Sequence, residues 1–527
     1  METNSKVYKW SLIERLTVTV LNFGGNIVLA RLLTTADFGL LAMIAIFTSI
    51  AYDLSSCGLS DGLIHKKSPT ADDYSTVFVF NAGVGFIFGT LFFVGAPWVA
   101  AFFGHNELIG IMRVLGVCFF CQTMSFVQET RLRKELKMKK VALVRIGATV
   151  TSLTLGIFLA ANGFGYWALV STQILLSFFL FIYFVAATRY FPRIRFKVRA
   201  FKEFFYFGIH LMLAYLGNII GKNVNTFVLG KFFSPSTSGV YYQGAKLANV
   251  PFAVTETSIN SPFFVIASNE NDKKRQRFLI HDMLSTIVAL NGAILMLMLV
   301  IARPGIEALY GQKWIAAVPV FRILALFEFL AGLKYYFHSV CKVHARTVFI
   351  RNMSFGEVAI QLALLAIFYR HGLIWIAWTQ IGGVAVSVLA HTILFTRLNG
   401  MSIGCFIATI IKAMVLPVAG AVVAATVGYG MAAAGGIHPL VESLMIIVTF
   451  FGAIIGAGEL FRPPLYIAVR SRLFHRQSAL LPIICVLKYI HSGGASGRRR
   501  PRCVCCGDQR LSRLRSRWSR MILRSRM

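Results

Sequence analysis

Long apolar runs separated by short polar turns fill most of the chain. A helix needs about 20 apolar residues to cross the hydrocarbon layer of a bilayer, and about fourteen runs approach that length. They lie near residues 10–33, 39–62, 76–102, 108–130, 141–161, 165–187, 204–229, 238–266, 281–302, 316–340, 351–369, 373–396, 404–428 and 440–461. The pattern predicts an all-α polytopic membrane protein with about fourteen transmembrane helices.

The two halves of the chain repeat one another. At a shift of 200 positions, VLARLLTTADFGL (28–40) meets VLGKFFSPSTSGV (228–240), which pairs Arg31 with Lys231 and Gly39 with Gly239. A shift of 207 aligns the TQI at 172–174 with the TQI at 379–381. Internal repeats are typical of transporters whose substrate site lies between the halves. We therefore predict two pseudo-symmetric six-helix lobes, residues 1–200 and 201–400, followed by two helices within 401–461.

Basic residues gather in every second loop. They are Lys66 and Lys67; Arg131, Arg133, Lys134, Lys137, Lys139 and Lys140; Arg189, Arg193, Arg195, Lys197, Arg199 and Lys202; Lys273, Lys274, Arg275 and Arg277; and Lys342 and Arg346. Short loops rich in Lys and Arg stay on the cytoplasmic side of a membrane. The alternation predicts that both termini are cytoplasmic. No cleavage motif follows the first run, so we expect it to stay in the membrane.

Composition agrees with a membrane protein and argues against a nucleic-acid partner. Hydrophobic residues make up 57% of the 527 positions and charged residues 14%. The formal net charge is +32, but residues 462–527 hold fifteen Arg and one Lys against a single Asp. Much of the net positive charge therefore lies in this tail and does not indicate a nucleic-acid-binding surface. We interpret residues 462–527 as a disordered or non-native tail, with a lipid-binding basic tail as the alternative.

The sequence contains no motif of a catalytic or metal site that we recognise. Gly221-Lys222-Asn223 lacks the upstream Gly and the following Ser or Thr of a P-loop, and neither HExxH nor GxSxG occurs. Cys118 and Cys121 have CxxC spacing, but inside an apolar run we expect two packed thiols. We expect the chain not to be an enzyme and to bind no cofactor or metal.

Polar side chains inside the apolar runs are the candidates for a binding site, because such groups are costly unless they face a cavity or a partner. The candidates share helical faces and carry cations or amides: Arg15, Asn22 and Asn26 in the first run, Arg145 in the fifth, Lys222 and Asn225 in the seventh, and Lys246 in the eighth. Guanidinium and ammonium groups suit an anionic, phosphate-bearing ligand. We predict that they line a central cavity.

Three polar side chains of the apolar runs leave more than one role open. Arg15 has Glu14 as a neighbour, so an internal ion pair or a side chain that reaches the membrane surface are alternatives to ligand binding. Asp53 and Glu256 are candidates for binding a coupling proton or sodium ion. Pairing of either acid with a nearby Lys or Arg is the alternative.

The chain resembles a known family in several segments. In the first half they are LARLLTTADFG (29–39), GLSDGLI (58–64) and DDYSTVFVFN (72–81); in the second half they are GK (230–231), GVYY (239–242), AKL (245–247) and Pro251. These strongly resemble the polysaccharide transport family, bacterial flippases for lipid-linked oligosaccharides that share a superfamily with multidrug and toxic compound extruders. The resemblance covers roughly residues 5–460. Many relatives have an acid before the second GK pair, where this chain has Asn223 and Asn225.

The resemblance implies two six-helix lobes that enclose a cavity in the bacterial cytoplasmic membrane. It also implies an undecaprenyl-diphosphate-linked glycan as cargo, with membrane lipids, a glycan polymerase and a chain-length regulator as partners. We therefore expect a flippase for surface polysaccharide biosynthesis. A multidrug extruder of the cation-antiporter type and a membrane glycan polymerase or ligase are the alternatives.

Overall fold

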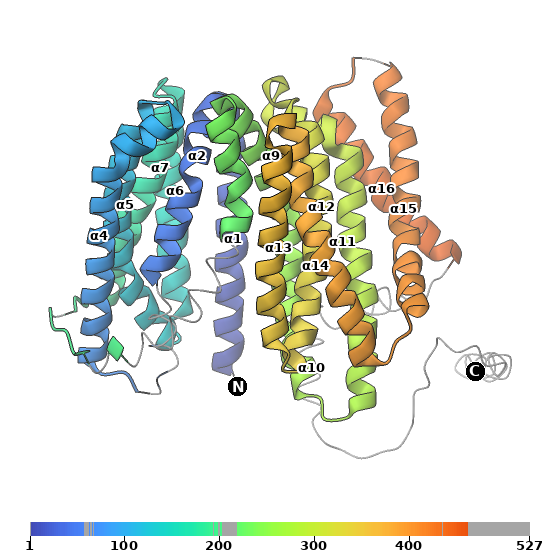
Figure 1. The fold of residues 1–527 in the computed structure, drawn as a ribbon, viewed down its shortest axis with the longest axis horizontal. Helices are drawn as coiled ribbons and strands as arrows, with labels where there is room; N and C mark the ends of the chain where they lie inside the picture. The colour runs from blue at the N-terminus through green and yellow to red at the C-terminus, as the bar shows by residue number, and fades with distance from the viewer. Residues whose placement is uncertain are drawn as a thin grey trace, which may run out of the picture.

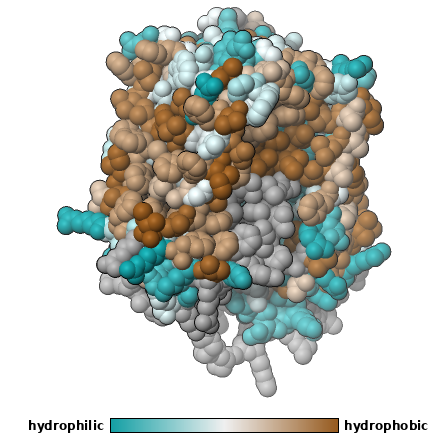
Figure 2. Space-filling view, turned by 60° about the vertical axis from the view of Figure 1, so that its left-hand side comes forward, coloured by the Kyte–Doolittle hydropathy of each residue, from teal (hydrophilic) through white to brown (hydrophobic). Residues whose placement is uncertain are grey.

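The computed structural model describes residues 2–56, 63, 66, 68–192, 194–198, 201–202, 219–434 and 436–461. Within these residues the chain is a bundle of long helices without a strand (Figure 1). Eleven of the described helices are long and apolar enough to cross a membrane. On the face shown in Figure 2, a broad hydrophobic band lies between two more polar rims. The predicted fold class, an all-α polytopic membrane protein, is confirmed.

The helices form two neighbouring bundles with α1 near the centre (Figure 1). The first half comprises α1 (Glu2–Leu32), α2 (Thr35–Ser56), α4 (Ala71–Phe103), α5 (Glu107–Lys134), α6 (Met138–Ala161) and α7 (Tyr166–Thr188). The second half comprises a helical segment at 219–232, α9 (Pro235–Thr255), η1 (Glu256–Asn260), α10 (Ser261–Asn269), α11 (Lys273–Tyr310), η2 (Gln312–Trp314), α12 (Ala317–Val343), α13 (Thr347–Phe368), η3 (Tyr369–His371) and α14 (Leu373–Asn399). The final pair, α15 (Ile403–Ala434) and α16 (Pro439–Phe461), packs beside α11.

Local sequence signals set the helix ends. Thr70 caps α4 through its side chain, and Asp73 returns a hydrogen bond to the Thr70 backbone, which completes a capping box. Gly104 ends the same helix with a left-handed backbone, φ 78°, that glycine adopts without strain. Ser234 caps α9 and Pro235 opens it, where the missing N–H of proline costs nothing.

The eighth predicted span, 238–266, is helical throughout but is not a regular α-helix. It consists of α9, a π-helical turn (η1) and α10. Pro251 lies inside α9, where its ring removes a backbone donor and disturbs the preceding turn. π-Helical turns are rare and occur frequently at functional sites. The predicted span is therefore helical along its whole length, with one irregular turn. The predicted span 204–229 lies partly outside the described residues.

The repeat seen in the sequence reappears as reciprocal contacts between the halves. A Cβ atom on Gly39 would lie 1.7 Å from the carbonyl oxygen of Pro235, and one on Gly239 would lie 1.9 Å from that of Thr35. The two contacts are related by the shift of 200. Only glycine permits so close an approach of two backbones. The first turns of α2 and α9 therefore touch directly.

A second pair of reciprocal contacts combines the shifts of 200 and 207. The Arg31 guanidinium donates through Nε to the carbonyl oxygen of Leu309 at 2.9 Å, and Lys231 donates to the carbonyl oxygen of Phe102. The basic partners differ by 200 positions and the acceptors by 207. The same contact thus occurs twice, once in each direction, as expected for an interface around a pseudo-two-fold axis.

Further bonds reinforce this contact, which we call the closed end. Thr35 Oγ1 and Ser236 Oγ lie 2.6 Å apart, and Trp314 Nε1 donates to the carbonyl oxygen of Ala30 at 3.0 Å. Trp314 is fully buried in an apolar cluster with residues of both halves, among them Leu33 and Phe38. The closed end lies opposite the basic end, where the N-terminus and the starts of α4, α11 and α13 lie (Figure 1).

Candidate functional site

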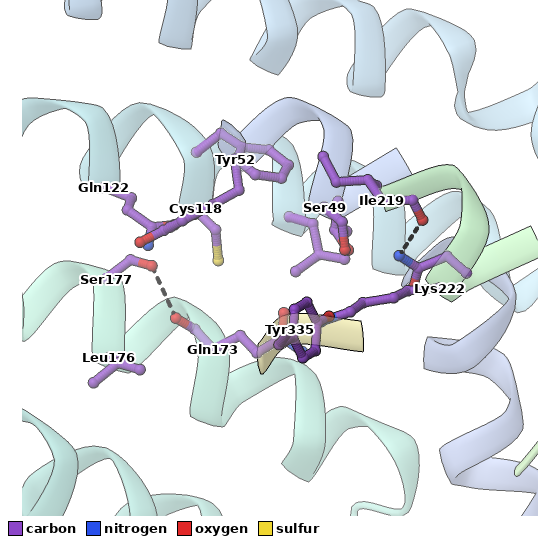
Figure 3. A pocket seen from close by; sticks show the side chains of 14 residues that line it. Ser49, Tyr52, Cys118, Gln122, Gln173, Leu176, Ser177, Ile219, Lys222 and Tyr335 are labelled. Carbon is purple, nitrogen blue, oxygen red and sulfur yellow. Dashed lines mark hydrogen bonds between the residues drawn. The ribbon is translucent and has the colours of Figure 1, made fainter. Parts of the chain in front are cut away.

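A cavity of about 640 Å³ lies between the halves (Figure 3). Its lining comes from α2, α5 and α7 of the first half and from the 219–232 helix and α12 of the second. The lining residues are Thr48, Ser49, Tyr52, Leu115, Cys118, Phe119, Gln122, Gln173, Leu176, Ser177, Ile219, Lys222, Asn223 and Tyr335. The prediction of a cavity between the halves thus has a counterpart in the structure.

The cavity wall is mostly neutral and carries one formal charge among its lining residues, the Lys222 ammonium group (Figure 3). Two of the wall's polar groups are held by their own helices: Asn223 Nδ2 donates to the carbonyl oxygen of Ile219 at 2.9 Å, and Ser177 Oγ donates to that of Gln173 at 3.1 Å. Lys222 is exposed to the cavity and has no hydrogen bond or ion pair to any described residue. Its charge is available to a ligand.

The polar residues predicted to share one face of α1 differ in their exposure. Arg15 and Asn22 are exposed, whereas Asn26, one turn nearer the closed end, is buried. The Asn26 amide oxygen accepts hydrogen bonds from Gln243 Nε2 at 3.3 Å and Tyr310 OH at 3.2 Å, both of the second half. Helix α1 therefore contacts the second half at Asn26, whereas it is exposed at Arg15 and Asn22. Asn26 joins the halves and is not accessible to a ligand in this conformation.

Arg145 belongs to a partly buried ion-pair cluster of the first half. It contacts Glu129 through two nitrogens, with Nη2 at 2.7 Å and 2.9 Å from the two carboxylate oxygens, and lies 3.4 Å from Glu14. Arg133 completes the cluster, at 2.7 Å from Glu129 and 3.3 Å from Glu14. Glu14 thus pairs with these two arginines and not with Arg15, and the alternative of an internal Glu14–Arg15 pair was wrong.

Asn225 lies on the same helix as Lys222 but points into a packed interior. It is fully buried, and its Nδ2 donates to Tyr241 OH at 3.0 Å and to the carbonyl oxygen of Ile376 at 2.9 Å. Gln361 donates to its Oδ1 at 3.2 Å. All hydrogen-bonding groups of this side chain are used within the protein. Asn225 therefore holds helices together and does not face the cavity.

The remaining candidates lie apart from the cavity lining. Lys246 is exposed and has no hydrogen bond or ion pair to a described residue. Glu256 borders a much smaller pocket of the second half. Asp53 lies in α2, and its side chain is outside the described residues. Cys118 and Cys121 are free thiols, and Cys118 is buried in the cavity wall. Among the described residues, no group of three or more His, Cys, Asp or Glu side chains is placed to hold a metal.

Sequence reasoning missed most of the cavity wall. Tyr52, Gln122, Gln173 and Tyr335 are uncharged and fall outside the cationic stripes. One signal for Gln173 was present, because it belongs to the TQI segment repeated at 379–381. The second-half equivalent, Gln380, accepts a hydrogen bond from Tyr241 OH at 2.7 Å. The same residue type thus lines the cavity in one half and supports packing in the other.

Comparisons with known proteins agree on one family. A model of the family described as polysaccharide biosynthesis protein matches residues 28–319. The chain is 24% identical over 425 residues to the teichuronic acid biosynthesis protein TuaB of Bacillus subtilis (strain 168), covering 79% of this chain and 87% of that protein. It is 23% identical to the lipopolysaccharide biosynthesis protein WzxC of Escherichia coli (strain K12), covering 62% and 67%. Against the succinoglycan biosynthesis transport protein ExoT of Rhizobium meliloti (strain 1021), identity is 22% and coverage 60% and 64%.

Solved structures share the fold at low sequence identity. The lipid II flippase MurJ in an inward closed conformation superposes with a TM-score of 0.70 and 14% identity, covering 86% of this chain and 99% of that one. An inward-facing multidrug resistance transporter of the MATE family superposes with a TM-score of 0.58 and 16% identity, covering 73% and 96%. These likenesses confirm two bundles of membrane helices as the architecture of the chain.

Proposed function

Because the chain belongs to the polysaccharide biosynthesis protein family, we propose that it is a flippase for lipid-linked oligosaccharides. The cargo is an oligosaccharide on an undecaprenyl diphosphate carrier, moved from the inner to the outer leaflet of the bacterial cytoplasmic membrane for surface polysaccharide biosynthesis. The names of its relatives support a role in polysaccharide export, since one is a succinoglycan biosynthesis transport protein and two others act in teichuronic acid and lipopolysaccharide biosynthesis.

The observation that carries this proposal is the cavity with Lys222 as its one charged lining residue. Unassisted flipping would strip the sugars and phosphates of hydrogen bonds to water, at several kcal/mol for each group. The neutral Ser, Thr, Asn and Gln groups of the wall offer replacement bonds to sugar hydroxyls, and Lys222 offers a charge to the diphosphate. A volume of about 640 Å³ suits the diphosphate and the first sugars, while the polyprenyl chain stays in lipid.

The closed end supports an alternating-access mechanism. The halves are joined there, and the exposed face at Arg15 and Asn22 lies on the basic-end side of the joint. With the basic loops cytoplasmic, this is an inward-facing state, and rocking of the bundles about the cavity would expose it to the other side. Outward movement of an anion also follows an inside-negative potential, worth about 2.3 kcal/mol per charge per 100 mV.

The predicted site residues take different roles in this mechanism. Lys222 binds the diphosphate inside the cavity, and Arg15 and Asn22 line the path that leads to it. Arg145 and Lys246 serve as further cationic contacts when the halves move, Arg145 by exchanging its carboxylate partners for phosphate. Asn26 and Asn225 are positioning residues, because their hydrogen bonds are used within the protein. Asp53 stays a candidate for ion coupling.

A multidrug extruder that exchanges cations is the nearest competitor, because it shares the fold. A cationic drug would be repelled by Lys222 and finds no carboxylate among the lining residues of the cavity. A polymerase or ligase is less well supported, because the turns at the closed end are short, as between Phe103 and Glu107 and between Ala161 and Tyr166. The chain is thus proposed to be a transporter and not an enzyme, working beside a separate glycan polymerase and chain-length regulator.

The test uses a strain that lacks this protein and is complemented with variants. We expect Lys222→Ala to abolish surface polysaccharide and to accumulate the lipid-linked intermediate on the inner leaflet, while Lys222→Arg retains export. Lys412→Ala is the matched control, since Lys412 is exposed on α15 and outside the cavity. Normal surface polysaccharide from Lys222→Ala at an unchanged membrane level would overturn the proposal.

A further inference from the structure

The second half contains a second, much smaller pocket at the irregular turn between α9 and α10. It lies where η1 replaces the regular helix and has a volume of about 10 Å³, close to that of a single water-sized sphere. Its lining comes from the end of α9, η1, α11 and α12 and consists of Thr255, Glu256, Ile259, Asn260, Ile287, Leu290, Asn291 and Gly332. None of these residues lines the large cavity. The pocket is a separate feature of the fold.

Several of the lining side chains carry oxygen atoms. Asn260 is only 8% exposed, and its Oδ1 has no hydrogen-bond partner among the described residues. No hydrogen bond or ion pair within the described chain engages the Glu256 carboxylate. Thr255 Oγ1 lies 2.9 Å from the Asn291 amide oxygen. A buried amide oxygen and a carboxylate without partners are costly in a membrane interior unless something binds them.

We infer that this pocket binds a monovalent alkali cation, with Glu256 and Asn260 as its main ligands. A proton on Glu256 would neutralise the carboxylate and supply one O–H donor, whereas an alkali ion accepts lone pairs from the carboxylate and from Asn260 Oδ1 together. Divalent Ca²⁺ takes six to eight oxygen ligands and Mg²⁺ keeps several waters, and a pocket of this size with one carboxylate offers neither.

The lysines nearest the pocket are not paired with Glu256. Three cations lie close enough to act electrostatically on Glu256, namely Lys222, Lys334 and Lys342. Lys334 is committed to Glu357, at 2.8 Å from one carboxylate oxygen and 3.1 Å from the other. Lys222 faces the large cavity. The neighbouring lysines therefore act on Glu256 from a distance and leave room for an ion against its carboxylate.

Gly332 shows how tightly the pocket is built. A Cβ atom at this position would lie 2.5 Å from the Asn291 side-chain nitrogen. Glycine therefore lets the Asn291 amide approach α12 and keeps it beside Thr255. The ligand groups are held by packing from three segments, which is how a binding site is kept in a fixed geometry.

The test measures ion binding and does not depend on the proposed cargo. The full chain is purified in detergent, and its thermal midpoint is followed while choline chloride is replaced by NaCl or KCl at constant ionic strength. We expect a saturable rise of the midpoint with one alkali ion, since ligands that bind only the folded state stabilise it; the two salts identify the ion. No rise with either salt, or a response to pH alone, would overturn the inference.

Variants locate the site. Glu256→Gln should abolish the ion-dependent rise, and Asn260→Ala should shift the half-saturating concentration at least tenfold. Glu328→Gln is the matched control, because Glu328 is an acid of α12 that accepts a hydrogen bond from Asn249 Nδ2 at 2.9 Å and lies outside the pocket. An ion response that survives in Glu256→Gln would place the ion elsewhere and refute the assignment.

Discussion

Replacing Gly39 with alanine should open the closed end. The added Cβ would lie 1.7 Å from the carbonyl oxygen of Pro235, and real Cβ contacts essentially never fall below 3.0 Å. The first turns of α2 and α9 must therefore part by about 1.3 Å. That movement stretches the 2.6 Å contact of Thr35 with Ser236 beyond hydrogen-bonding distance. Overpacking of this kind costs about 1–3 kcal/mol, and the lost hydrogen bond about 1 kcal/mol.

The combined cost, about 2–4 kcal/mol, lowers the population of the closed end relative to open states roughly 30- to 900-fold. Ser238 reports the change, because it is fully buried one residue from Gly239. A Ser238→Cys variant in an otherwise cysteine-free chain should resist a membrane-impermeant maleimide added outside the cell. The same reporter should react much faster in the presence of Gly39→Ala, and Gly239→Ala should act in the same way.

Two glycines serve as matched controls. A Cβ atom on Gly24 of α1 or Gly83 of α4 would meet nothing within 4 Å. Gly24→Ala and Gly83→Ala should therefore leave the labelling rate of the Ser238→Cys reporter unchanged. If Gly39→Ala labels no faster than these controls while the protein reaches the membrane, the backbone contact does not hold the halves together and the reasoning is refuted.

Three further changes test other parts of the structure. Arg145→Gln removes the two-pronged partner of Glu129 and should lower the unfolding free energy by about 1–3 kcal/mol, seen as a lower thermal midpoint; an unchanged midpoint would contradict the ion-pair cluster. Asn225→Ala removes three buried hydrogen bonds, to Tyr241, Ile376 and Gln361, and should cost about 2–4 kcal/mol, so the membrane level falls, whereas Lys222→Ala should retain its level. Deleting residues 463–527 should leave export and insertion unchanged, and loss of export with normal insertion would show that the tail is functional.

The fold was predictable because its signals are local. Apolar runs set the helices, and turn residues such as Thr70, Gly104 and Pro235 set their ends. The irregular turn at Glu256–Asn260 was not predictable in the same way. Pro251 marks a disturbance, but whether a helix bends, ends or widens into a π-helical turn depends on the neighbours it packs against.

The site was predictable only in part, because polar residues on one face of a helix do not show which part of the protein that face contacts. Lys222 and Asn225 lie on adjacent turns and share a stripe in the sequence. The structure places Lys222 at the cavity and Asn225 against α14 and Gln361. Both positions satisfy the rule that polar groups in membranes need partners, and only the packing distinguishes a ligand site from a structural hydrogen bond. Neutral lining residues such as Gln122 carry still less signal.

The repeat explains why the closed end is symmetric while the cavity is not. Residues that match between the halves, Gly39 with Gly239 and Arg31 with Lys231, make each contact of the closed end twice. The cavity charge arises where the repeat fails, because the shift of 200 places Lys222 on Asn22. A joint about which two bundles rock works best with equivalent contacts on both sides, whereas a charged headgroup needs its counter-charge on one side only. The matched positions therefore serve movement, and the unmatched ones serve recognition.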